Sequence, residues 1–173
     1  MINLRSVFLV LVLLSVTTGM GVAQWVQTGP YGGNFRCLAV SGTNLFAGGG
    51  GVFLSTNAGA NWSAASAGLT DLSVYALAAS GTNLFAGTSG AGVFLSTNNG
   101  TSWTSVNTGL TNTNVRALVV SGTNLFVGTY GGGVFLSTNN GASWAAVNTG
   151  LTNNFVNAFT ASGTSLFAGT SGG

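Results

Sequence analysis

Very few side chains in this sequence could perform acid–base or ionic chemistry. The charged residues of the 173-residue chain are Arg5, Arg36, Asp71 and Arg116, and histidine, lysine and glutamate are absent from it. General acid–base catalysis needs a group that titrates near the working pH, usually His, Glu, Asp or Lys. Asp71 would have to act without a second titratable group to shift its pKa or share its role. We therefore expect no enzyme activity, no catalytic residue, no metal site and no bound cofactor.

The remaining charge also excludes nucleic acid as a partner. Nucleic-acid binders neutralise several phosphates with clustered lysines and arginines. Here Arg36 and Arg116 lie 80 positions apart in the sequence. The chain is nevertheless expected to fold, because 46% of its residues are hydrophobic and only 2% are charged, the reverse of a disordered composition. A surface made of Ser, Thr, Asn and Gly suits a β-rich extracellular protein.

Residues 1–23 have the pattern of a secretory signal peptide. Arg5 supplies the positive start, residues 7–16 form an apolar run of ten, and small residues end at Ala23, before a cut at Gln24. A membrane-spanning helix needs about 20 apolar residues. We therefore expect cleavage, no stable membrane span afterwards, and a secreted or cell-surface protein. An uncleaved anchor is the alternative.

The sequence is dominated by a near-identical internal repeat, the feature to seek first. The segment SGTNLFAG at 41–48 returns with small changes at 80–87, 121–128 and 162–169, at offsets of 39, 41 and 41 residues. A second landmark, VFLSTN followed by a glycine and a tryptophan, occupies 52–62, 93–103 and 134–144.

Each repeat contains four short apolar runs separated by turn residues. In the third repeat the runs are 115–120, 125–128, 134–137 and 143–147. Runs of this length bounded by Gly, Asn and Ser are typical of strands. The sequence Asn140-Gly141 favours a hairpin turn in which both central residues have positive φ. A helical interpretation fails because glycine interrupts every window.

Four strands in about 41 residues is the period of a β-propeller blade. We therefore predict an all-β fold, a β-propeller of four-stranded antiparallel blades with about 3.5 blades present and no closed ring. The predicted blades are 33–70, 72–110, 113–151 and a partial blade 154–173, with 24–29 as a stray closing strand. Two explanations stay open. Either the chain is the N-terminal piece of a longer propeller, or copies self-associate through open blade edges.

A motif of eight residues in each of the first three repeats resembles the Asp box, or BNR repeat, whose pattern is Ser-x-Asp-x-Gly-x-Thr-Trp. Its positions here are Ser55, Asn57, Gly59 and Trp62, then Ser96, Asn98, Gly100 and Trp103, and finally Ser137, Asn139, Gly141 and Trp144. Asparagine replaces the defining aspartate in every copy, and it can still accept hydrogen bonds from the turn. The resemblance implies a structural brace with packed tryptophans. Sugar stacking by the tryptophans is the alternative.

Asp-box propellers include sialidases, sortilin-type propellers, some xyloglucan-active glycoside hydrolases and photosystem II assembly-factor-like proteins. Sialidases need an arginine triad, a tyrosine with a glutamate, and an acidic proton donor, which this chain cannot supply. Most glycoside hydrolases need two carboxylates. The resemblance therefore implies an exported, non-catalytic scaffold or binding module for a protein or glycan ligand. The alternative is the N-terminal fragment of a secreted glycoside hydrolase whose catalytic residues lie outside this chain.

A speculative binding surface consists of positions at which the repeats differ. Arg36, Tyr75, Arg116 and Asn157 share one repeat position. Tyr130 lies in the Gly-rich turn where other repeats have serine. Such variation could mark the rim or channel of a propeller, or a solvated position that is free to drift.

The single cysteine, Cys37, has no partner for an internal disulfide. Its repeat position holds alanine in the other copies, at Ala76, Ala117 and Ala158. A small buried side chain is therefore the favoured interpretation, with a reactive thiol as the alternative.

Overall fold

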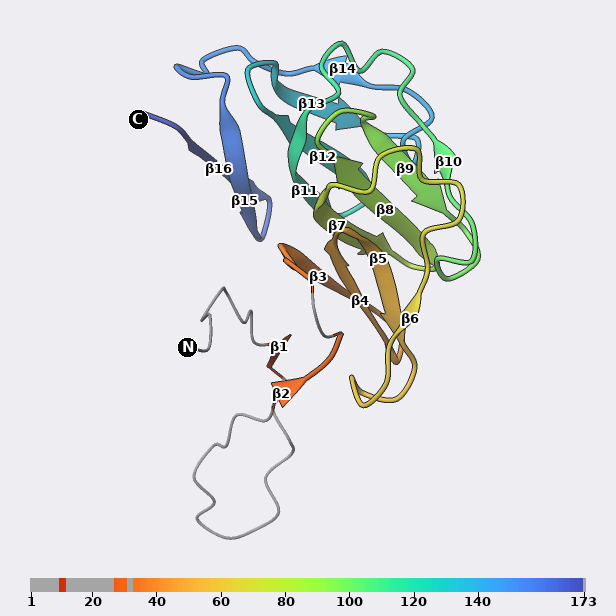
Figure 1. Ribbon diagram of the computed structural model, residues 1–173. Helices are drawn as coiled ribbons and strands as arrows, with labels where there is room; N and C mark the ends of the chain where they lie inside the picture. Colours follow the sequence, from red (N-terminus) through yellow and green to blue (C-terminus); the bar gives the residue numbers. More distant parts are fainter. Residues whose placement is uncertain (1–9, 12–26, 31–32, 173) are drawn as a thin grey trace, which may run out of the picture.

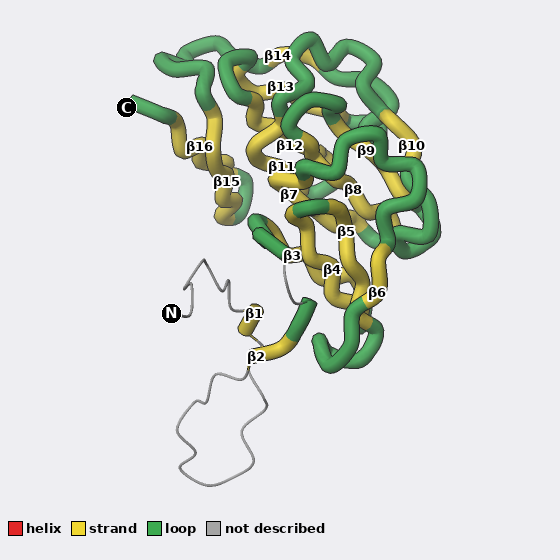
Figure 2. The backbone as a smooth tube through the Cα atoms, viewed as in Figure 1, coloured by secondary structure: helices red, strands yellow, loops and turns green. Residues whose placement is uncertain are grey.

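The regular secondary structure of the described residues is entirely β. A computed structural model describes residues 10–11, 27–30 and 33–172, and Figure 2 shows only strands and loops in these segments. In this part of the chain there is no helix with the length and apolar character needed to cross a membrane. The predicted signal peptide, 1–23, lies outside the described residues except for Val10–Leu11.

From β3 onward, three four-stranded sheets and one two-stranded sheet follow one another along the chain. The first sheet contains β3 (Cys37–Ser41), β4 (Asn44–Gly49), β5 (Gly51–Ser55) and β6 (Ser63–Ala64). The second contains β7 (Val74–Ser80), β8 (Asn83–Thr88), β9 (Val93–Ser96) and β10 (Thr104–Ser105). The third contains β11 (Val115–Ser121), β12 (Asn124–Thr129), β13 (Gly133–Ser137) and β14 (Ala145–Ala146), and the last contains β15 (Val156–Ser162) and β16 (Ser165–Thr170).

Consecutive strands pair antiparallel in every sheet, so each sheet is a simple meander. Within the described residues the sheets form an open series and not a closed ring. The prediction of an all-β fold with four-stranded antiparallel blades and an incomplete ring is therefore confirmed.

The turn residues adopt the conformation that the sequence predicts. In the hairpin between β9 and β10, Asn99 has a φ of 54° and Gly100 a φ of 77°. The third sheet repeats this with Asn140 at 56° and Gly141 at 82°. Asparagine and glycine tolerate the left-handed region better than other residues do, although the first repeat places Ala58 there, with a φ of 53°. The turn lies within a longer loop, 97–103 in the second sheet, and is not a two-residue hairpin.

The first strands of successive sheets lie side by side. In Figure 1, β3, β7, β11 and β15 are neighbours near the middle of the molecule, whereas β6, β10 and β14 lie at the periphery. Because the sheets are repeats, equivalent residues of the first strands fall along one line. A side chain at that position in one sheet can therefore contact its counterpart in the next.

Two hydrophobic clusters join the three full sheets. One cluster combines Phe46 of the first sheet with Leu77 and Trp103 of the second. The other combines Phe85 of the second sheet with Trp144 of the third. Phe46 and Phe85 have no exposed surface. The apolar runs are continuous because each inner strand is buried on both faces by neighbouring sheets.

The two outer faces of the series expose residues that are buried elsewhere. On β3, Leu38 is 53% exposed and Val40 is 61% exposed. On β16, Phe167 is 57% exposed, although it is the repeat equivalent of Phe46 and Phe85. Sequence position therefore does not decide burial here. The presence of a neighbouring sheet does.

The stray strand predicted at 24–29 is partly described. β2 (Gln27–Thr28) pairs antiparallel with β1 (Val10–Leu11), in a separate two-stranded sheet. Residues 24–26 lie outside the described residues.

Candidate binding surface

Three of the four speculative surface residues stack on one another across adjacent first strands. The guanidinium carbon of Arg36 lies 4.0 Å from the centroid of the Tyr75 ring. That of Arg116 lies 4.1 Å from the same centroid. Arg36 precedes β3 and Arg116 is on β11, so the two guanidinium groups reach Tyr75 on β7 from the sheets on either side. Cation–π contacts at this distance stabilise the arrangement.

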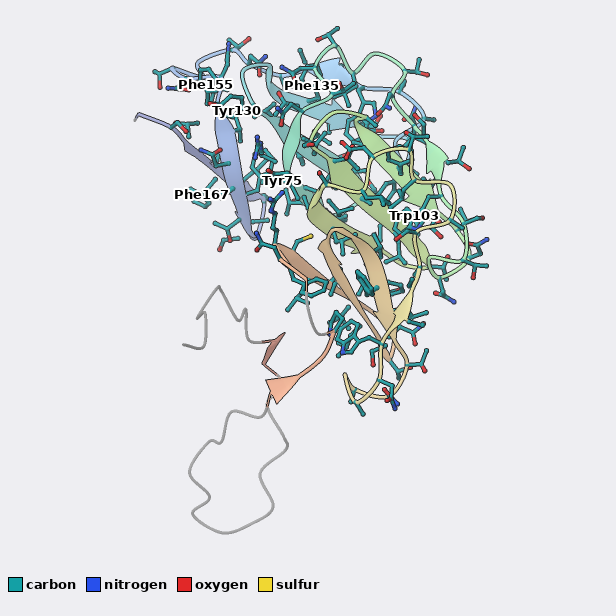
Figure 3. All side chains as sticks on the ribbon, viewed as in Figure 1. Tyr75, Trp103, Tyr130, Phe135, Phe155 and Phe167 are labelled. Carbon is teal, nitrogen blue, oxygen red and sulfur yellow. The ribbon has the colours of Figure 1, made fainter. Side chains whose placement is uncertain are left out.

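The stack continues to the turn of the third sheet. The guanidinium carbon of Arg116 lies 5.1 Å from the centroid of the Tyr130 ring. Tyr130 in turn contacts Phe155 edge to face, with centroids 4.7 Å apart and ring planes at 72°. Figure 3 shows Tyr75, Tyr130 and Phe155 on the side where β7, β11 and β15 meet, away from Trp103. We call Arg36, Tyr75, Arg116 and Tyr130 the Arg–Tyr ladder.

A chain of asparagines positions the middle of the ladder. Arg116 Nε donates to Asn114 Oδ1 at 3.0 Å. The backbone amide of Asn114 donates to Asn112 Oδ1 at 2.9 Å, and Asn112 Nδ2 donates to the carbonyl of Tyr130 at 3.2 Å. The orientation of Arg116 and the turn that carries Tyr130 are therefore set by the same polar segment.

The carboxylate of Asp71, the only acidic residue in the sequence, accepts hydrogen bonds that stabilise turns of the second repeat. Its Oδ1 accepts from the backbone amide of Ser73 at 2.8 Å. Its Oδ2 accepts from the amide of Gly90 at 2.8 Å and from the hydroxyl of Ser89 at 3.2 Å. Asp71 is the repeat equivalent of Asn112. Both carboxylate oxygens of Asp71 therefore hold backbone segments of the second repeat together.

A hollow of about 410 Å³ lies beside the first arginine of the ladder. Arg36 lines it together with Phe35, Phe53 and several glycines. The two phenylalanine rings pack edge to face, with centroids 5.4 Å apart. A group that binds the exposed guanidinium of Arg36 could therefore place an apolar part in the hollow.

The serine–asparagine–glycine turns form the same hydrogen-bond network in each copy. In the second sheet, the Ser96 hydroxyl donates to Asn98 Oδ1 at 2.9 Å and accepts from the Gly100 amide at 2.9 Å. Asn98 Oδ1 also accepts from the Ser102 amide at 2.9 Å. The first and third copies repeat these bonds with Ser55, Asn57 and Gly59, and with Ser137, Asn139 and Gly141. A neutral asparagine thus serves as the acceptor of the turn.

The tryptophans of these turns differ in what they contact. Trp103 Nε1 donates to the carbonyl of Ala65 in the preceding sheet at 2.7 Å, and Trp144 Nε1 donates to Val106 at 2.7 Å. Both indoles are buried, at 4% and 5% exposed. Trp62 is half-buried and donates to Gly59 within its own turn at 3.0 Å. The buried pair packs between sheets and presents no open face for a sugar.

We expect Ser96→Ala to lower the free energy of unfolding by about 1–3 kcal/mol, because the amide of Gly100 would lose its buried acceptor. Ser96 is 1% exposed, so water cannot easily replace the hydroxyl. Chemical denaturation measures the loss. The matched control is Thr101→Ala, an exposed position of the same turn where the third repeat already has alanine. Equal stability of the two variants would contradict the role of Ser96.

Cys37 lies half-buried against the second strand of the first sheet. A Cβ added to Gly48 would come within 2.5 Å of its Sγ, so the thiol fills the space above that glycine. Burial raises the pKa of the Cys37 thiol to about 12, against weaker lowering effects of a hydrogen bond with Gly48 and the charge of Arg36. The neutral thiol is therefore the form that the fold favours.

We expect the folded protein to react slowly with an aromatic disulfide reagent at pH 8, and fast once it is unfolded, because the thiolate is the nucleophile. Since the folded pKa is raised, the stabilisation from Cys37 is complete below the unfolded pKa, about 8.5, and is lost as the pH rises toward 12. Cys37→Ala should remove that part of the pH dependence. Fast reaction in the folded state would contradict the buried assignment.

Within the described residues, no group of three or more His, Cys, Asp or Glu side chains is placed to hold a metal ion.

The sequence identifies the ladder residues through one variable repeat position and one Gly-rich turn. Sequence reasoning missed Asn112, Asn114 and Phe155. For the asparagines a signal existed, since Asn112 shares its repeat position with Asp71 and Asn153.

No protein-family model matches the sequence, and no significant match to a curated protein was found. Among solved structures, the computationally designed Ika4 protein is similar with a TM-score of 0.66 and 14% identity, over 83% of this chain and 89% of that chain. The GH74 enzyme of Niastella koreensis has a TM-score of 0.58 and 23% identity, over 78% of this chain and 21% of that chain. YCF48 bound to D1 peptide has a TM-score of 0.57 and 14% identity, over 68% of this chain and 42% of that chain.

These likenesses show the fold. The GH74 and YCF48 structures are β-propellers, so they support a propeller arrangement of the sheets described above. The chain spans about a fifth of the GH74 enzyme and about two fifths of YCF48.

Proposed function

We propose that this chain is an exported, non-catalytic propeller module that binds a protein or glycan ligand through the Arg–Tyr ladder. One observation carries the proposal. The repeats are nearly identical, yet one position of the first strands holds Arg36, Tyr75 and Arg116, and these divergent side chains contact one another. Random substitution at a solvent-exposed position would not be expected to produce two arginines whose guanidinium groups stack on the tyrosine between them.

The chemistry of the ladder fits a ligand that carries an acidic group. Guanidinium groups stay charged at all working pH values, and their planar forks match carboxylates in a bidentate geometry. Stacking on Tyr75 uses the face of each guanidinium. Arg116 Nε already donates to Asn114, so its terminal N–H groups are the ones that would bind such a group. Tyr130, 49% exposed, adds an aromatic surface beside Arg116. The exposed ring suits an apolar part of a peptide or the face of a sugar.

The three serine–asparagine–glycine–tryptophan turns support placing the chain with the Asp-box propellers. We propose a non-catalytic role because hydrolysis of glycosides normally uses two carboxylates, and the single one, Asp71, holds a turn together. The fold alone cannot decide this, since one propeller fold serves many functions.

A second candidate is the N-terminal part of a secreted glycoside hydrolase, which the likeness to GH74 enzymes favours. The native secreted product that contains this chain is assayed for release of reducing sugar from xyloglucan, because the GH74 structures include a xyloglucanase. Release would favour the hydrolase, with its catalytic carboxylates outside this chain. No release would favour the binding module.

The proposal that the protein is exported is based on the signal-peptide pattern of residues 1–23. We expect a product in the culture medium that begins at Gln24. A cell-associated product that begins at Met1 would contradict export.

An array experiment tests the binding proposal. The secreted protein and its Arg36→Gln/Arg116→Gln variant are applied to peptides with free or amidated C-termini, and to glycans with and without carboxylates. We expect the wild type to bind carboxylate-bearing probes and the variant to lose them while it still unfolds in a cooperative thermal transition. Identical binding profiles of the two proteins would reject the ladder as the binding surface.

A further inference from the structure

We propose that two copies of this chain dock head to tail, with the outer face of β3 in one copy packed on the outer face of β15 and β16 in the other. We call these the leading face, marked by Leu38 and Val40, and the trailing face, marked by Phe167. The inference goes beyond the ligand-binding role and rests on different residues.

The leading face is a repeat equivalent of surfaces that are already buried inside the chain. Leu38 shares its repeat position with Leu77, which is 8% exposed and belongs to the cluster between the first and second sheets. Leu118, at the same position of the third sheet, packs against the cluster between the second and third sheets. At Leu38 the equivalent side chain is 53% exposed, because β3 begins the first of the four-stranded sheets.

The trailing face is the other half of the same interface. Phe46 and Phe85 are fully buried, because the turn of the next sheet covers each ring. A Cβ added to Gly100 would lie 3.2 Å from the Phe46 ring, and one added to Gly141 would lie 3.4 Å from the Phe85 ring. Phe167 holds the same position on β16 and is 57% exposed, because β15 and β16 form the last sheet among the described residues.

The trailing face of a second copy therefore matches the leading face of the first copy, and its leading face matches the trailing face of the first. The contact between copies would continue the sheet-to-sheet interface that the chain already builds between its own sheets. Such a contact is heterologous, because it joins two different surfaces, and it closes into a ring only if the rotation between copies permits. An exposed apolar face of this kind favours association.

Docking would also extend the Arg–Tyr ladder. Within one copy, Tyr75 has an arginine on both sides, but Arg36 has the first strand of another sheet on one side only. A β15 strand from a second copy, packed on β3, would bring its Asn157 to the open side of Arg36, since the two residues share one repeat position. The ladder would then continue from one copy to the next.

Light scattering coupled to size exclusion, over a hundredfold dilution series, tests the proposal on the product of the whole sequence. We expect a species larger than the monomer that dissociates on dilution. The double variant Leu38→Lys/Val40→Lys blocks the leading face, and Phe167→Asp blocks the trailing face. Each alone should be monomeric, because every contact needs one intact face of each kind.

An equimolar mixture of the two blocked variants is the decisive sample. Each retains the face that the other lacks, so the mixture should form a one-to-one dimer and stop there. The control Leu72→Lys removes an exposed leucine, 51% exposed, from the segment between β6 and β7, and should assemble like the wild type. A monomeric wild type, assembly that survives in both blocked variants, or a mixture that stays monomeric would each overturn head-to-tail docking.

Discussion

Phe85→Ala is expected to lower the free energy of unfolding by about 3–5 kcal/mol, the usual cost of deleting a buried phenylalanine. Phe85 has no exposed surface and lies in the cluster that joins the second and third sheets. Its removal would leave a cavity beneath the turn that contains Gly141. Both sheets depend on this contact, so the loss should appear as a lower midpoint for the whole unfolding transition.

The repeat provides an internal control for this prediction. Phe167→Ala makes the same chemical change at the same repeat position, but the ring is 57% exposed. Surface substitutions of this kind usually change stability by less than about 0.5 kcal/mol. Guanidinium denaturation at a protein concentration where the chain is monomeric compares the two. A similar loss in both variants would show that burial between sheets does not set the stability.

Gly109→Ala is expected to be destabilising by about 3 kcal/mol, from two causes. Gly109 has a φ of +83°, where an alanine costs about 1–2 kcal/mol. A Cβ there would also lie 2.3 Å from the carbonyl oxygen of Trp144. The backbone of Trp144 would have to move. Two hydrogen bonds hold that residue against the second sheet, one from its backbone amide to the carbonyl of Thr108 and one from its indole to the carbonyl of Val106. Each weakened hydrogen bond adds about 1 kcal/mol.

Gly122→Ala separates these causes. Gly122 has a φ of +60°, and a Cβ there would meet no atom within 4 Å. Only the conformational cost applies, about 1 kcal/mol. Differential scanning calorimetry should therefore rank the wild type above Gly122→Ala, and Gly122→Ala well above Gly109→Ala. If the two variants melted together, the close approach of neighbouring sheets at Gly109 would be refuted.

The architecture could be predicted from the sequence because the repeat determines it. A period of about 41 residues, apolar runs of strand length and Asn-Gly turns leave few alternatives to a four-stranded meander. The hydrogen bonds of Asn98 also follow from the motif, since a side-chain carbonyl can replace the carboxylate of aspartate as an acceptor.

The candidate binding surface could be predicted only as a set of positions. The sequence shows that Arg36, Tyr75 and Arg116 share one repeat position, but not that the spacing of the sheets brings a guanidinium within about 4 Å of a ring. That distance depends on how the sheets pack. The sequence alone therefore leaves open whether this position drifts freely or forms a functional surface, and the binding experiments decide between the two.

The two ends of the series show a further limit of repeat reasoning. The motif treats Trp62, Trp103 and Trp144 as equivalent, yet only the last two donate to a preceding sheet. Trp62 lies in the turn of the first four-stranded sheet, and its indole donates a hydrogen bond within that turn. Equal sequences thus have unequal surroundings, because burial is a property of neighbouring sheets.

The most direct test of the ladder is a calorimetric titration of the strongest carboxylate-bearing array probe into three proteins. These are the wild type, Arg116→Lys and Arg36→Gln/Arg116→Gln. Hydrogen bonds to charged groups contribute about 1.5–3 kcal/mol, so the double variant should bind at least about tenfold more weakly. Arg116→Lys should also bind more weakly, because lysine keeps the charge but not the planar fork. Wild-type affinity in the double variant would contradict the assignment of this surface.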